Sequence, residues 1–186
     1  MPDLSGKRIA ILATHGFEQS ELEEPKKQLS GWGAEVHVIA PEEGEIKGWD
    51  KTDWGRPVKV DRQLSDVSEG DYDVLVLPGG QINPDVLRTK PEAVKLVRAF
   101  HDAKKPIGAI CHGPWLLVEA DVVRGRRLTS FNSIRTDLIN AGARWEDAEV
   151  ITDEGIVTSR NPGDLDAFCA KVAEETLEGK HTSRAA

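Results

Sequence analysis

The stretch that decides the fold is Ile107-Gly108-Ala109-Ile110-Cys111-His112-Gly113-Pro114. A short apolar run ends at a cysteine, and a second apolar segment follows over residues 115–120. This pattern predicts a buried strand, a sharp turn with the thiol at its apex, and the start of a helix. A helix start stabilises a thiolate through its free N–H groups, so the sequence predicts a nucleophile at Cys111. The alternative is that this cysteine is a small buried hydrophobic residue.

Strand and helix patterns alternate on both sides of this turn. Strands are expected over residues 8–13, 35–40, 73–77, 107–110 and 128–131, and helices over residues 19–29, 91–103, 133–141 and 164–178. Pro25 leaves the start of the first helix open. Residues 49–61 are expected to form a long loop with a small strand or hairpin, and residues 149–159 a β-hairpin. The alternation predicts an α/β fold with a mostly parallel sheet and helices on both faces.

Size and charge narrow the class of protein. The 186 residues, of which 39% are hydrophobic, suit one domain over residues 1–186 with a polar tail from about residue 180. No apolar run approaches the roughly 20 residues that cross a bilayer, and the polar residues 1–7 do not resemble a signal peptide. A net charge of -8 argues against a nucleic-acid partner. The two cysteines imply no disulfide framework, which favours the reducing cytoplasm.

Three loops are expected to meet at one edge of the sheet. In open parallel sheets, ligands bind beyond the carboxyl ends of the strands. The segments that follow three predicted strands are residues 14–18, 78–81 and 111–113. We therefore expect Glu18, Gly79, Gly80, Cys111 and His112 to share a pocket.

Three ionisable residues near the predicted nucleophile each have two interpretations. Glu18 either caps the first helix or faces the thiol, where burial would favour its protonated form and let it act as a general acid or base. His112 could pair with the sulfur if the turn swings the imidazole back and a third group orients it. Asp85 is a candidate for that group, although it could simply open a short helix after Pro84.

The glycines and the remaining histidines complete the candidate site. Gly79 and Gly80 could form an oxyanion hole with the N–H of His112, or they could make only a tight turn. His15 could contact the substrate or lie on a surface loop. No metal site and no nucleotide fingerprint are expected. Cys169 follows helical apolar spacing and is assigned to the core, whereas Trp49 and Trp54 could pack over the core or anchor a subunit interface.

Five motifs together resemble the ThiJ/PfpI family of the class I glutamine amidotransferase-like superfamily, and its intracellular protease-like PfpI branch in particular. They are Gly16-Phe17-Glu18, Leu77-Pro78-Gly79-Gly80, residues 109–114, residues 121–126 and Thr158-Ser159-Arg160. The resemblance implies a flavodoxin-like three-layer sandwich, a homodimer or hexamer, and no cofactor. It also implies a nucleophile at Cys111 in a strained backbone, a supporting carboxyl at Glu18, and a triad acid from a neighbouring subunit, which maps to Asp85. His15 stands where many members carry aspartate.

Three activities follow from this resemblance. The first is a stress-related cysteine hydrolase acting on peptides through Cys111, His112 and the acid after the double glycine. The second is cofactor-independent conversion of methylglyoxal, or deglycation, which needs Cys111 and Glu18 but no complete triad. The third is a redox sensor or chaperone-like protein, whose thiol is oxidised rather than turned over.

Overall fold

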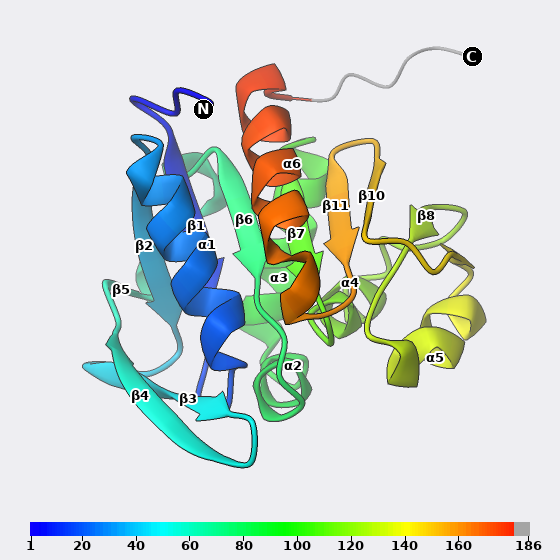
Figure 1. Ribbon diagram of the computed structural model, residues 1–186, viewed down its shortest axis with the longest axis horizontal. Coiled ribbons are helices and arrows are strands. Elements are labelled where there is room, and N and C mark those ends of the chain that lie inside the picture. The colour runs from blue at the N-terminus through cyan, green and yellow to red at the C-terminus, as the bar shows by residue number, and fades with distance from the viewer. Residues whose placement is uncertain (181–186) are drawn as a thin grey trace.

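Seven strands form the central sheet in residues 1–180, the part of the chain that this computed structural model describes (Figure 1). Their order is β10-β11-β7-β6-β1-β2-β5. The bounds are β1 (Arg8–Leu12), β2 (Glu35–Ala40), β5 (Arg62–Gln63), β6 (Val74–Leu77), β7 (Ile107–Ile110), β10 (Val150–Asp153) and β11 (Ile156–Ser159). Within this sheet of the described residues, only β10 and β11 pair antiparallel, as the predicted hairpin. The predicted α/β class with a mostly parallel sheet is therefore confirmed.

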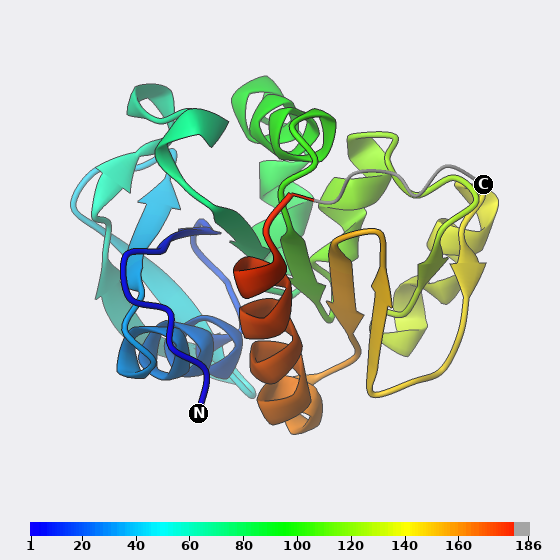
Figure 2. The same cartoon turned by 90° about the horizontal axis from the view of Figure 1, so that it is seen from above.

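Helices cover both faces of this sheet (Figure 2). Helices α1 (Gln19–Gly31) and α6 (Leu165–Glu178) lie on one face, and α3 (Pro91–Asp102) and α4 (Pro114–Glu119) lie on the other. Successive strand residues point to opposite faces. Ile9 and Ile11 accordingly pack in the core with α1 and α6, whereas Ala10 and Leu12 pack in the core with α3 and α4. The result is the flavodoxin-like three-layer arrangement. No helix within residues 1–180 is long and apolar enough to cross a membrane.

A hairpin at the sheet's edge holds the loop after β1. Strands β3 (Glu45–Asp50) and β4 (Asp53–Lys59) form it below α1 in Figure 1. Gly16 N–H donates to the carbonyl of Lys47 at 2.8 Å, and Trp49 N–H donates to that of Phe17 at 2.7 Å. The predicted hairpin is therefore present, although it begins at residue 45 rather than within residues 49–61. Trp49 and Trp54 meet edge to face, and Trp54 is 45% exposed.

The expectation of a strand over residues 128–131 is wrong. Strand β8 (Arg127–Leu128) is only two residues long and pairs with β9 (Arg144–Trp145). Beyond it, Thr129 N–H donates to the Thr158 hydroxyl at 2.9 Å, and Phe131 N–H donates to the Cys111 carbonyl at 2.8 Å. These donors have left the strand ladder, so the segment becomes a loop that runs beside the cysteine turn. A turn at Asn132–Ile134 and helix α5 (Arg135–Asn140) follow it.

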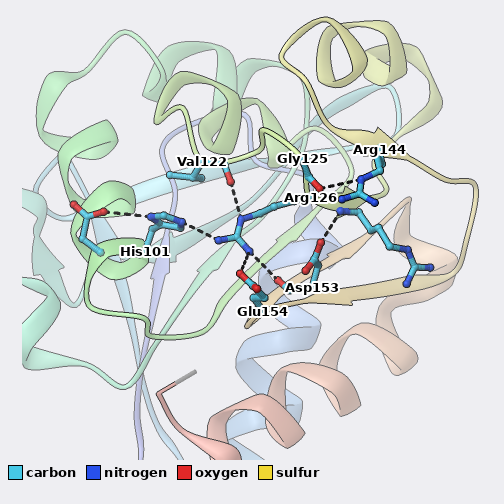
Figure 3. A network of polar contacts seen from close by, with 9 residues as sticks. His101, Val122, Gly125, Arg126, Arg144, Asp153 and Glu154 are labelled. Atoms are coloured by element: carbon cyan, nitrogen blue, oxygen red, sulfur yellow. Dashed lines mark hydrogen bonds and ion pairs between the residues drawn. The ribbon is translucent and has the colours of Figure 1, made fainter. Parts of the chain in front are cut away.

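The side chain of Arg126 joins three elements in one polar network (Figure 3). Its guanidinium donates to the Val122 carbonyl at 3.0 Å, to Glu154 in the β10–β11 turn at 3.2 Å, and to His101 Nε2 on α3 at 3.0 Å. Because arginine only donates, His101 Nε2 must accept and its Nδ1–H must face Asp102 at 3.2 Å. The network therefore fixes the hairpin and α3 against the segment before β8.

Two helices settle boundaries that the sequence left open. Helix α1 begins at Gln19 and continues through Pro25, which is buried inside it. Helix α2 (Ile82–Leu87) begins two residues before Pro84. Both helices start directly after the loops that converge at the carboxyl edge of the sheet, so their first turns face the candidate site.

Candidate active site

The loops after β1, β6 and β7 lie together, as the sequence predicts. Glu18 N–H donates to the carbonyl of Gly79 at 3.2 Å, which joins the first two loops. A Cβ atom built on Gly79 would lie 2.6 Å from the Cβ of Cys111, so the second and third loops touch. Position 79 therefore has no room for a side chain.

Cys111 occupies a strained backbone position at the tip of β7. Its φ angle of 62° lies in the left-handed region, where an L-residue costs about 1–2 kcal/mol. Its N–H donates to the Ser159 carbonyl at 3.0 Å, and its carbonyl accepts from Phe131 N–H at 2.8 Å. These two bonds hold the turn from both sides. The thiol is free, and the residue is 5% exposed.

The carboxyl group beside this thiol belongs to Glu21. Glu21 is fully buried in the first turns of α1. Its Oε2 accepts from Gly79 N–H at 2.9 Å, and no N–H or O–H group of residues 1–180 donates to its buried Oε1. The carboxyl lies within hydrogen-bonding reach of the Cys111 sulfur. The thiol and the carboxyl therefore interact directly within one buried site.

Electrostatics limit this pair to one negative charge. Burial, and then the charge of Glu18, raise the pKa of Glu21 to about 8. Burial, and then the Glu21 carboxylate, raise the pKa of the Cys111 thiol, while the N–H groups of Gly80 and His112 act in the opposite direction. The backbone N–H groups that the sequence predicts near the thiolate are thus present, but burial and Glu21 have the larger effect. The sulfur can carry the charge when Glu21 holds the proton.

Glu18 itself caps helix α1. Its Oε2 accepts from Ser20 N–H at 3.1 Å, and its Oε1 accepts from the Ser20 hydroxyl at 2.7 Å. The structure thus corrects the placement of Glu18 against the sulfur, because the helix turns its cap residue back onto its own first N–H groups. Glu21, one turn later, takes the place expected for it.

His112 pairs with the sulfur despite being its neighbour in sequence. Its Nδ1 lies 3.1 Å from Cys111 Sγ, and its Nε2 lies 3.0 Å from the hydroxyl oxygen of Ser133. Phe131 stacks on the imidazole and Trp115 meets it edge to face. Burial lowers the pKa of His112, which favours a neutral ring able to accept a proton.

The other predicted site residues are divided between the pocket and the surface. Gly80, at φ 81°, directs its N–H at the sulfur together with that of His112, whereas the N–H of Gly79 is taken by Glu21. His15 is exposed and accepts from Lys47 N–H at 3.0 Å. Asp85 is exposed in α2 and, within residues 1–180, hydrogen-bonds to none of the other site residues. No cluster of metal-ligating side chains exists in the same range.

Comparison with known proteins agrees with this geometry. Residues 7–175 match the profile of the DJ-1/PfpI family. The chain is 45% identical to the putative cysteine protease YraA of Bacillus subtilis over 163 residues, which are 87% of this chain and 94% of that one. It is 42% identical to Deglycase PfpI of Pyrococcus furiosus over 161 residues, again 87% of this chain and 94% of the relative.

Solved structures give the same result. A two-domain protein from Anabaena variabilis, with DJ-1/ThiJ/PfpI-like and ferritin-like domains, superposes with a TM-score of 0.86 at 32% identity. The match covers 97% of this chain and 52% of that larger chain. DJ-1beta of Drosophila melanogaster superposes with a TM-score of 0.82 at 28% identity, covering 92% of this chain and 94% of the other. From its sequence, its fold and the arrangement around Cys111, this chain belongs to the DJ-1/PfpI family.

Proposed function

We propose that this chain is a cofactor-independent deglycase that acts on α-oxoaldehydes and on the adducts they form with proteins. The observation that carries the proposal is the fully buried Glu21 carboxyl against the Cys111 thiol, with a pKa raised to about 8 by burial. A carboxyl that titrates near neutral pH is suited to moving protons in both directions. The name Deglycase PfpI, given to a relative 42% identical to this chain, supports the same reaction class.

The chemistry needs no outside oxidant. The thiol gives its proton to the Glu21 carboxylate or to His112 Nδ1 as the sulfur attacks the aldehyde carbon. A C–S bond forms, and the carbonyl oxygen takes up the proton to give a hemithioacetal. One proton then moves from the sulfur-bearing carbon to the neighbouring carbon, and a second moves from the hydroxyl of the first carbon to the carbonyl oxygen of the second. The first carbon is thereby oxidised to a thioester and the second reduced to an alcohol. Water then cleaves the C–S bond, releasing a hydroxy acid and the thiol.

The residues around the sulfur suit these steps. The N–H groups of Gly80 and His112 face the sulfur and can stabilise negative charge as the thiol is deprotonated. Glu21 is the nearest acid, since Glu18 is bound to Ser20. Each proton transfer then runs between neighbouring atoms of one buried site.

A cysteine peptidase is the second candidate. It is favoured by the 3.1 Å contact between Cys111 Sγ and His112 Nδ1, and by the putative cysteine protease YraA, 45% identical to this chain. In this alternative Asp85 would complete a triad from a neighbouring subunit. A homodimer or hexamer is a further part of the proposal, and size-exclusion chromatography with light scattering tests it.

A side-by-side assay separates the two activities. Methylglyoxal, methylglyoxal-treated acetyl-arginine and a fluorogenic peptide panel are given to wild-type protein and to variants. Cys111→Ser should abolish all turnover. Glu21→Gln should lower aldehyde turnover by about 100-fold or more, as expected for loss of a general acid–base group. Glu24→Gln, a half-buried acid on the same helix that pairs with Lys27, is the matched control and should leave aldehyde turnover unchanged.

The outcomes decide between the candidates. Full aldehyde turnover in Glu21→Gln would refute the deglycase proposal. Peptide hydrolysis that needs Cys111 and is lost in Asp85→Asn, with no aldehyde turnover, would establish the peptidase instead. Asp85→Asn with unaltered aldehyde turnover agrees with the deglycase.

A further inference from the structure

The imidazole of His112 is held at both ring nitrogens by groups of its own chain. Nδ1 lies 3.1 Å from the Cys111 sulfur, and Nε2 lies 3.0 Å from Ser133 Oγ. Two aromatic rings fix the plane of the imidazole, because Phe131 stacks on it at 4.9 Å between centroids and Trp115 meets it edge to face at 5.2 Å. The ring therefore has one defined orientation.

Ser133 reaches this position through the loop beside the cysteine turn. It lies in the turn Asn132–Ile134, directly after Phe131. The N–H of Phe131 donates to the Cys111 carbonyl, so one short segment covers the imidazole, ties the nucleophile's backbone and presents the serine hydroxyl. The register of Ser133 against His112 is thus set by the same bond that holds the nucleophile.

A serine hydroxyl can donate or accept, and as the acceptor at Nε2 it makes Nδ1 the base. The hydroxyl oxygen can accept from Nε2–H, which leaves the lone pair of Nδ1 facing the thiol. When Nδ1 takes the thiol proton, the ring becomes a cation with an N–H at each nitrogen. Nδ1–H then faces the new thiolate, and Nε2–H still has its acceptor in Ser133. The charged ring is therefore hydrogen-bonded at both ends.

We propose that Ser133 is a positioning residue that holds His112 in the Nε2–H tautomer and so makes Nδ1 the base for Cys111. Its role is the one for which the sequence offers Asp85, but it lies in the same chain and needs no neighbouring subunit. The inference deepens the proposed function, since it concerns activation of the same thiol. It can be measured without any substrate.

The test is the rate at which iodoacetamide alkylates Cys111, followed by mass spectrometry of the peptide that contains it. Ser133→Ala should slow alkylation near neutral pH by about 3- to 10-fold, the range expected for loss of one neutral hydrogen bond. Ser133→Thr keeps the hydroxyl and should stay within about twofold of wild type. Ser65→Ala, an exposed serine in the turn Leu64–Asp66, is the control and should match wild type.

A second measurement does not depend on a variant that folds. In the wild-type protein labelled with ¹⁵N-histidine, the His112 ring nitrogens should report Nε2 protonated and Nδ1 unprotonated at neutral pH. A ring protonated at Nδ1 would overturn the proposal, as would alkylation of Ser133→Ala at the wild-type rate or equal slowing in the Ala and Thr variants.

The two proposals fail separately. If Ser133→Ala slows alkylation but the wild-type protein turns over no aldehyde, the role of Ser133 stands and the deglycase proposal falls. If the wild-type protein turns over aldehyde and Ser133→Ala leaves the alkylation rate, kcat and KM unaltered, the deglycase proposal stands and the role of Ser133 falls.

Discussion

Replacing Glu21 by glutamine should change how the protein's stability depends on pH. Burial raises the pKa of Glu21 in the folded protein from its ordinary value near 4.5 to about 8. Between these values the folded state binds more protons than the unfolded state, so the free energy of unfolding falls as pH rises. At 1.36 kcal/mol per pH unit the total effect has an upper limit of about 5 kcal/mol. The wild-type protein should therefore lose stability steadily from about pH 5 to pH 8.

Glutamine has nearly the same shape, can still accept from Gly79 N–H, and does not ionise. Glu21→Gln should be close to wild type in stability near about pH 5, and more stable by up to several kcal/mol near about pH 8. Urea unfolding followed by circular dichroism at a series of pH values measures the gap, with Glu24→Gln as the control for removing one charge from α1. Parallel curves for wild type and Glu21→Gln would refute the raised pKa and with it the shared proton.

Two further predictions concern the stability of the fold around Gly80 and Arg126. Gly80→Ala should destabilise the protein by about 1–3 kcal/mol more than Gly44→Ala. The two glycines have nearly the same φ angles, 81° and 80°. A Cβ atom at position 80 would clash with the carbonyl of Gly16 and lie 2.6 Å from the nitrogen of Glu18, whereas nothing lies within 4 Å of a Cβ atom at position 44. Equal urea midpoints for the two variants would contradict this. Arg126→Lys should lower the free energy of unfolding by about 1–2 kcal/mol, because lysine cannot make all of the guanidinium's hydrogen bonds. Arg124→Lys is the control: its side chain is 73% exposed, and it should lower the free energy of unfolding by less than about 0.5 kcal/mol. Thermal unfolding compares the two variants.

The sequence predicted the three strands whose loops form the site, and the meeting of those loops. Buried β-strands such as Val74–Leu77 and Ile107–Ile110 are short continuous apolar runs, which are typical of a parallel sheet covered on both faces. That topology places Gly79 and Cys111 side by side, although they are far apart in the chain. The position of the nucleophile therefore followed from local pattern and a general rule of topology.

The choice between Glu18 and Glu21 did not follow in the same way, although a signal existed. Glu21 shares the buried side of α1 with Leu22, Pro25 and Leu29. An acid on an apolar helix face is a stronger signal of a functional site than an acid at a strand end, because burying a carboxyl group costs free energy. The sequence analysis placed Glu18 near the thiol because Glu18 lies in the loop directly after the first strand, yet that position is the N-cap of α1.

Ser133 could not be found from sequence. Its contact with His112 depends on the loop leaving strand β8 after Leu128, when Thr129 N–H turns to a side-chain acceptor. The competition between a strand ladder and a threonine hydroxyl 29 residues away is a tertiary effect. No local pattern within residues 128–133 reports it.

Pro25 has a consequence for the reactive pair. A proline has no N–H, so the backbone carbonyl of Glu21, four residues earlier, receives no helical hydrogen bond from it. The turn that bears the carboxyl therefore has one helical hydrogen bond fewer, beside the bonds at the cap and at Gly79. The backbone that carries the reactive carboxyl is thus one bond looser than an ordinary helical turn, at a position that touches neither the sulfur nor the imidazole.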